Sequence, residues 1–163
     1  MPILLCRVDD RLIHGQVVVG WGARLGLDYI VVVDDGLAAS PWEQELYRAG
    51  LPDSIEAHFP NVDEAAGLIP SWVAEANRGF ILTRDIQTMR RLAERGVLND
   101  IEINLGGLHA APKRQRVLPY LFLSEDDLKE LERLNRAAVQ VNAQDVPSAR
   151  KVTLDDILNS RSR

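Results

Sequence analysis

The chain has 163 residues, of which 46% are hydrophobic and 26% charged, and these values are typical of a globular protein with one core. Its formal net charge of -5 argues against a nucleic-acid-binding surface, because phosphate contacts usually need an excess of basic residues. No apolar run approaches the roughly 18 to 20 residues that span a bilayer, and the single cysteine, Cys6, excludes an internal disulfide and favours a cytosolic protein.

Short apolar runs predict seven β-strands. They occupy residues 3–8, 29–33, 55–59, 80–83, 101–105, 120–123 and 139–142. The run over residues 29–33 is continuously apolar and mostly β-branched, which is typical of a strand buried on both faces of a sheet. The stretch 106–115 is the most loop-like part of the chain.

Helical patterns lie between these strands. We predict helices over residues 16–25, 41–49, from 61–64 onward, over 85–95 and from 124 to about 136, with a short terminal helix capped by Thr153. Residues 40–43 have the form of a capping box with proline at the first helical position. Pro70 is expected to interrupt or restart its helix. Alternating strands and helices predict a single-domain α/β fold over residues 1–163, with an open, mostly parallel twisted sheet covered by helices on both faces.

Polar clusters follow four of the predicted strands. They are residues 9–14, Asp34-Asp35-Gly36, Thr83-Arg84-Asp85 and Gly106-Gly107-Leu108-His109. Ligands of open α/β sheets bind beyond the carboxyl ends of the strands, so we expect these clusters to meet at one edge of the sheet.

His14 is the best candidate for a nucleophile in these clusters. The backbone N–H groups of Gly15 and Gln16, at the start of the following helix, can point at an anion on the imidazole ring. Gly15 would also let the backbone approach that anion closely. The alternative is that His14 merely caps the helix.

Arg11 carries a planar set of donors that matches phosphate oxygens. Asp9 or Asp10 can hold Arg11 in place or orient the imidazole of His14. Alternatively, these acidic and basic residues form ordinary surface ion pairs, which contribute little to stability.

Further residues of the predicted edge have weaker functional signals. His109 can assist in the site or bind a phosphoryl oxygen, although histidines beside glycines are often plain loop residues. Asp34 and Asp35 resemble a metal-binding pair but are more typical of a solvated loop that lines the floor of a pocket. A structural role is expected for His58, outside these clusters.

Trp21 and Trp42 fall on predicted helices and are expected to pack in the core, as is Cys6 within the first strand. The chain lacks the glycine-rich motifs that bind nucleotides, the nucleophile elbow of hydrolases and any zinc-type spacing of histidine and cysteine. The sequence therefore predicts neither a metal nor a cofactor.

The run Arg7-Val8-Asp9-Asp10-Arg11-Leu12-Ile13-His14-Gly15-Gln16-Val17, followed by Trp21, resembles the phosphorylation loop of a known family. This family comprises the IIB components of mannose/fructose/sorbose-type bacterial sugar phosphotransferase systems. Residues 30–35 resemble its second strand, and Ile103-Asn104-Leu105-Gly106-Gly107-Leu108 resembles its Asn-x-Gly-Gly-Met segment, with Leu108 in place of methionine. His109 is not a regular feature of the family, and Thr83-Arg84-Asp85 replaces a segment that often contains Asn-Pro.

The resemblance implies that His14 is the phosphorylated histidine of a cytoplasmic carrier. The family accepts a phosphoryl group from a phosphohistidine on the IIA component and passes it to a sugar carried by the membrane components IIC and IID. This activity is that of a protein-N(π)-phosphohistidine–sugar phosphotransferase, a transferase or kinase that can lie at the inner face of the membrane. Arg11 would stabilise the phosphoryl group and Asp10 would be its partner within the loop, while Asp9, Asp34, Arg84, Gly106, Gly107 and His109 are secondary candidates.

Two alternative functions are compatible with parts of this sequence. The same fold can serve as a phosphorylation-dependent regulator without sugar transport. Val8-Asp9-Asp10 also resembles the acidic pair of response-regulator receiver domains, but the third predicted strand ends in Ala57-His58-Phe59-Pro60 and offers no aspartate to phosphorylate.

Overall fold

The computed structural model describes residues 2–138 and 140–160, and a seven-stranded sheet runs through its centre. The strands are β1 (Ile3–Val8), β2 (Tyr29–Val32), β3 (Glu56–His58), β4 (Gly79–Thr83), β5 (Ile103–Leu105), β8 (Val141–Ala143) and β9 (Val152–Thr153), in the order β3-β2-β4-β1-β5-β8-β9. All neighbours pair in parallel except β9, which runs antiparallel to β8. This confirms the predicted mostly parallel α/β sheet. Val139, the first residue of the last predicted strand, lies outside the described residues.

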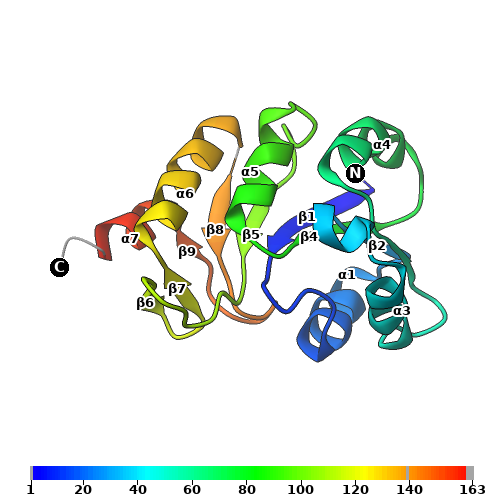
Figure 1. Ribbon diagram of the computed structural model, residues 1–163, viewed down its shortest axis with the longest axis horizontal. Helices are drawn as coiled ribbons and strands as arrows, with labels where there is room; N and C mark the ends of the chain where they lie inside the picture. The colour runs from blue at the N-terminus through cyan, green and yellow to red at the C-terminus, as the bar shows by residue number, and fades with distance from the viewer. Residues whose placement is uncertain (1, 139, 161–163) are drawn as a thin grey trace.

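Helices cover both faces of the sheet (Figure 1). The helical segments are η1 (Gln16–Gly22), α1 (Ala23–Leu25), α2 (Asp35–Ala38), α3 (Pro41–Ala49), α4 (Val62–Ala74), α5 (Ile86–Glu94), α6 (Glu125–Ala137) and α7 (Leu154–Ser160). Side chains from η1, α2 and α3 pack with one hydrophobic cluster, and side chains from α4, α5, α6 and α7 pack with the other. A two-stranded hairpin of β6 (Gln115–Leu118) and β7 (Leu121–Leu123) lies beside the main sheet.

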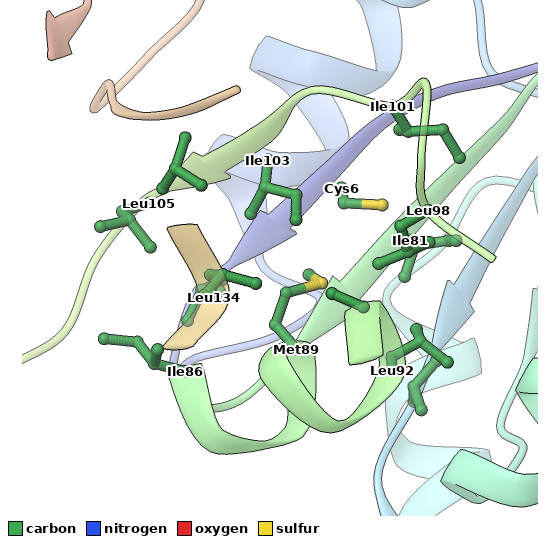
Figure 2. Close-up of a cluster of buried hydrophobic side chains, with 14 of the residues drawn as sticks. Cys6, Ile81, Ile86, Met89, Leu92, Leu98, Ile101, Ile103, Leu105 and Leu134 are labelled. Atoms are coloured by element: carbon green, nitrogen blue, oxygen red, sulfur yellow. The ribbon is translucent and has the colours of Figure 1, made fainter. Parts of the chain in front are cut away.

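Alternate residues of the central strands supply the two clusters, as the twofold periodicity of a strand requires. In β1, Leu5 packs with the first cluster and Cys6 with the second. Figure 2 shows Cys6 among the side chains of the second cluster, which include Ile103 and Met89. Burial raises the pKa of the Cys6 thiol, so Cys6 is a core residue, as predicted.

The helix that follows the first loop begins as a π-helix rather than the expected α-helix. η1 contains Gly20 and Gly22, and glycine weakens the preference for a regular α-helix. Val17 and Trp21 are nevertheless buried at their spacing of four, and Gly26 ends the segment in the left-handed region with a φ of 62°.

Pro70 was wrongly expected to break its helix, because α4 continues through it from Val62 to Ala74. Its start carries a complete capping box between Asn61 and Glu64, which stabilises the first turn. A loop was expected between the second predicted strand and α3. The structure has the short helix α2 there, and the side chain of Asp34 caps its first turn.

Two predictions at α3 are wrong. The side chain of Ser40 makes no capping hydrogen bond, although Pro41 does occupy the first turn. Trp42 is 67% exposed, because α3 packs through its other face, where the ring of Tyr47 lies 6.4 Å from that of Phe59. The hairpin strand β6 and the edge strand β9 were not predicted, since both are short and only half of their residues are apolar.

Candidate functional site

The loop after β1 lies between the loops that follow β4 and β5, at the carboxyl edge of the sheet (Figure 1). The backbone N–H of Asp9 donates to the carbonyl of Thr83 at 2.9 Å, and that of Asp10 donates to the carbonyl of Gly107 at 2.9 Å. The predicted meeting of these polar clusters at one edge is therefore observed.

Leu12 anchors the loop. Its φ of 57° is unusual for a bulky residue, and its side chain is fully buried in the first hydrophobic cluster. Its backbone N–H donates to the carbonyl of Asp9 at 3.0 Å. Burial of the Leu12 side chain thus offsets the backbone strain and holds the turn that brings His14 back towards Asp9.

Asp9 is the centre of the site. Its carboxylate is completely buried, with Oδ2 at 3.2 Å from Nε2 of His14 and 3.6 Å from Nη2 of Arg7. Its Oδ1 accepts the backbone N–H of Arg11 at 3.2 Å and lies 3.8 Å from Nε of the same residue. Burial alone would raise the pKa of Asp9, but the contacts with His14, Arg7 and Arg11 outweigh it and lower this pKa. Asp9 is therefore a buried carboxylate that faces an imidazole.

The imidazole of His14 presents its two nitrogens to different surroundings. Nε2 is buried against Asp9, whereas Nδ1 forms no hydrogen bond within residues 2–138 and 140–160. The side chain keeps 15% of its surface exposed. A carboxylate on one ring nitrogen fixes the tautomer and leaves a lone pair on the other nitrogen.

Arg7 supports Asp9 from inside the protein, and it was missing from the predicted site residues. It is 1% exposed, donates through Nη1 to Oδ1 of Asn104 and to the carbonyl of Gln144 (2.7 Å), and through Nη2 to the carbonyl of Asp145 (2.7 Å). Burial lowers the pKa of Arg7, an effect that the carboxylate of Asp9 opposes. An arginine inside an apolar strand was the available signal in the sequence.

Two neighbours shape the space around Arg7. Its guanidinium carbon lies 4.9 Å from the ring centre of Trp21, so the buried indole also makes a cation–π contact. A Cβ on Gly106 would overlap the guanidinium, which explains why glycine occupies this position of the loop after β5.

A chain of buried amides extends from Arg7 across the sheet. Arg7, Asn104 and Asn142 are register partners on β1, β5 and β8. Asn104 donates to Oδ1 of Asn142 at 2.7 Å, and Asn142 donates to Oε1 of Glu102 at 2.5 Å. Glu102 in turn pairs with Lys151 at 2.8 Å. Each amide is thereby oriented by the next, which fixes the acceptor that holds Arg7.

Arg11 lies on the exposed side of Asp9, with 43% of its side chain accessible. Its Nη2 donates to Oε1 of Gln16 at 2.9 Å. Gly15 adopts ordinary helical angles, and a Cβ there would meet nothing within 4 Å, so the space beside it is open. Arg11, Gly15 and Gln16 thus line the outer side of the loop that carries His14.

Asp10 pairs with His109 rather than with Arg11. Its Oδ1 lies 2.6 Å from Nδ1 of His109, and its Oδ2 accepts the backbone N–H of His109 at 2.8 Å. Arg114, which was not predicted, donates to the carbonyl of His109 at 3.0 Å and lies 4.0 Å from Oδ2 of Asp10. Of the two acidic residues expected to hold Arg11, Asp9 contacts it, whereas Asp10 links the loops after β1 and β5.

Asp34 and Arg84 form a separate pair at this edge. Oδ1 of Asp34 caps α2 by accepting the N–H of Leu37 at 2.8 Å, and Oδ2 accepts Nε of Arg84 at 3.1 Å. Neither residue forms a hydrogen bond or ion pair with His14 within the described residues. Asp35 binds the N–H of Val62 (3.0 Å) and Nη1 of Arg91 (2.9 Å), so the two carboxylates serve structure rather than a metal.

His58 packs between aromatic rings, as expected of a structural residue, with ring centres 5.9 Å from Tyr29 and 5.7 Å from Trp72. Over the part of the chain that the structure describes, no group of three or more histidine, cysteine or acidic side chains can hold a metal ion. In the same part, no helix combines the length and apolar character needed to cross a membrane.

The family model of the PTS system sorbose subfamily IIB component matches residues 3–163. The chain is 32% identical over 156 residues to the N-acetylgalactosamine-specific phosphotransferase enzyme IIB component 1 of Escherichia coli, covering 94% of this chain and 97% of that protein. It is 28% identical over 148 residues to the fructose-specific EIIB component of Bacillus subtilis, covering 91% and 90%.

The mannose-specific EIIAB component of E. coli is a longer relative. The chain is 27% identical to it over 159 residues and spans about half of its length. Among solved structures, the N-acetylgalactosamine-specific IIB component 1 of E. coli has a TM-score of 0.85 at 30% identity, covering 93% of this chain and 99% of that one. The N-acetyl-galactosamine IIB component from Streptococcus pyogenes has a TM-score of 0.86 at 27% identity, covering 96% and 97%.

Proposed function

Because the chain belongs to the IIB components of the sorbose subfamily of the phosphotransferase system, we propose that His14 carries the phosphoryl group and bears it on Nδ1. IIB components are phosphoryl carriers of sugar transport systems, so the chain must present a group that both accepts and releases phosphoryl. The observation that carries this proposal is the burial of His14 Nε2 against the carboxylate of Asp9, which leaves Nδ1 available.

In the first transfer, the lone pair of Nδ1 attacks the phosphorus of a phosphohistidine on the IIA component. The bond between phosphorus and the donor nitrogen breaks, and its electron pair returns to the donor ring. The buried carboxylate of Asp9, with Oδ2 at 3.2 Å from Nε2 of His14, stabilises the positive charge that develops on the ring. Both partners are imidazoles of similar basicity, so the step is close to thermoneutral and reversible.

The transition state of this transfer spreads negative charge over three phosphoryl oxygens. Arg11 supplies planar donors beside His14, and the free N–H groups at Gly15 and Gln16 supply backbone donors at the start of the helical segment. Buried Arg7 holds Asp9 rather than the phosphoryl group. Positioning and electrostatic stabilisation by this chain thus account for the transfer.

In the second transfer, phosphorylated His14 passes the group to a hydroxyl of a sugar presented by the membrane components IIC and IID. IIB components work with IIA and with these membrane components in general. We place this chain in the cytoplasm, at the inner face of the membrane, because its donor and its acceptor meet there. The specific reaction is that of a protein-N(π)-phosphohistidine–sugar phosphotransferase.

A labelling experiment with matched alanine variants tests the proposal. The protein is incubated with phosphoenolpyruvate, the general phosphotransferase proteins and a candidate IIA. We expect His14→Ala to accept no label, while His58→Ala, which removes the structural histidine of β3, accepts label like the wild type. The label on the wild type should be labile in acid and stable in base, unlike the acyl phosphate of a receiver domain. Labelling of His14→Ala by IIA would refute the carrier role.

A further inference from the structure

A second histidine lies at the same edge of the sheet, bound to a carboxylate. Nδ1 of His109 is 2.6 Å from Oδ1 of Asp10, while the backbone N–H of His109 donates to Oδ2 of the same carboxylate. These two contacts fix both the position and the rotation of the imidazole. The side chain is 57% exposed, and its Nε2 forms no hydrogen bond within the described residues. A carboxylate on Nδ1 is the arrangement that prepares the opposite nitrogen to take a proton.

His109 is close to the groups that surround His14. A Cβ placed on Gly107 would lie 3.6 Å from Oδ1 of Asp9, 3.7 Å from Cε1 of His109 and 3.8 Å from Nη2 of Arg11. The three atoms therefore surround the same small space above Gly107, and Cε1 of His109 is bonded directly to Nε2. The free nitrogen of His109 thus lies within reach of a molecule that contacts both Arg11 and phosphorylated His14.

The second transfer needs a proton acceptor that the first does not need. A sugar hydroxyl loses its proton as its oxygen bonds to phosphorus, whereas the attacking nitrogen of His14 carries no proton. Asp9 is buried against His14 and Asp34 is engaged by α2 and Arg84, so neither of these carboxylates is free for this task.

Resting on the proposed function of His14, we propose that His109 is the catalytic base for transfer to the sugar, with Asp10 as its positioning residue. The sugar oxygen attacks phosphorus, the bond from phosphorus to Nδ1 of His14 breaks, and its electron pair returns to that nitrogen. The hydroxyl proton passes to Nε2 of His109, whose Nδ1–H remains bound to Asp10. The products are a sugar phosphate, neutral His14 and protonated His109, which releases its proton to water.

Four charged groups lie around His109. Asp10 contacts the ring directly, and Arg114 binds the His109 carbonyl while lying 4.0 Å from Asp10. Arg11 and Asp9 lie across Gly107. The imidazole thus has both a carboxylate and guanidinium groups around it.

The test separates the two transfers. Wild type, His109→Gln and His58→Gln are phosphorylated by IIA, and phosphorylated protein is then mixed with membrane vesicles that contain the IIC and IID components. The acceptor is whichever of mannose, fructose, sorbose and N-acetylgalactosamine the wild type phosphorylates. Glutamine is polar and of similar length but cannot take a proton, and His58→Gln is the matched control.

We expect His109→Gln to accept label from IIA at the wild-type rate and to transfer it to the sugar about 100-fold more slowly. If His109→Gln transferred the phosphoryl group to the sugar at the wild-type rate, the proposal would be overturned. Equal slowing of both transfers would also overturn it, since it would indicate a phosphoryl contact or a structural role. Failure of the wild type to accept label on His14 would instead refute the proposed function.

Discussion

Replacing Arg7 with methionine should destabilise the protein strongly, although the substitution removes a charge from the core. Arg7 is 1% exposed and holds Asp9 at 3.6 Å. Without it, Asp9 keeps a buried charge, while the acceptors on Asn104, Gln144 and Asp145 lose their donor. Breaking a buried ion pair costs about 3 to 5 kcal/mol, and each unsatisfied buried acceptor costs about 1 to 3 kcal/mol. These terms overlap, so we expect a loss of about 3 to 5 kcal/mol in the free energy of unfolding.

Urea denaturation followed by circular dichroism measures this loss. Arg116→Met is the matched control, because Arg116 is exposed on the hairpin strand β6, and we expect it to change stability by no more than about 0.5 kcal/mol. If Arg7→Met lowered the free energy of unfolding by less than about 1 kcal/mol, with an unchanged denaturant slope, the buried carboxylate of Asp9 would not depend on Arg7 as we infer.

Three further predictions concern the residues around Asp9. Arg11→Lys should slow phosphoryl acceptance from IIA about tenfold, because an ammonium lacks the planar fork, whereas Arg24→Lys in α1 should not; equal rates in stopped-flow labelling would exclude Arg11 from the site. The lowered pKa of Asp9 stabilises the fold above the pKa of about 3.9 of an unfolded aspartate. This stability is lost as the pH falls through the lower pKa of the folded state. In urea denaturations repeated across the acid range, the free energy of unfolding should therefore fall less steeply for Asp9→Asn than for the wild type. An equally steep fall in both proteins would contradict this prediction. Gly106→Ala should displace Arg7 and lower the thermal midpoint, and a midpoint at or above the wild-type value would show that the contact is not tight.

Much of the architecture was predictable because local patterns determine it. Continuous apolar runs indicated the central strands, and the helical pattern over residues 85–95 corresponds to α5 (Ile86–Glu94). The elements that escaped prediction, α2, β6 and β9, are short, so their few residues carry too little periodicity to indicate a helix or a strand. Trp42 was misplaced because a helix pattern shows that a large residue is present but not which helix face meets the sheet.

The positions of some site residues could be predicted from the sequence, but the contacts between them could not. His14 and Arg11 follow the first strand directly, so their position at the sheet edge followed from the topology. The pairing of Asp10 with His109 joins residues 99 positions apart, and sequence patterns carry no information about such contacts. Arg7 was overlooked because its role depends on register partners on β5 and β8 that assemble only in the folded sheet.

The most direct test of the carrier role is to identify the phosphorylated atom in the wild-type protein. After incubation with phosphoenolpyruvate, the general phosphotransferase proteins and IIA, the labelled residue is mapped by mass spectrometry under basic conditions. Nitrogen-15 NMR of the labelled histidine ring then distinguishes Nδ1 from Nε2. We predict a single phosphohistidine at His14, with phosphorus on Nδ1. Phosphorus on Nε2, which is buried against Asp9, or a label on any other residue would contradict the account.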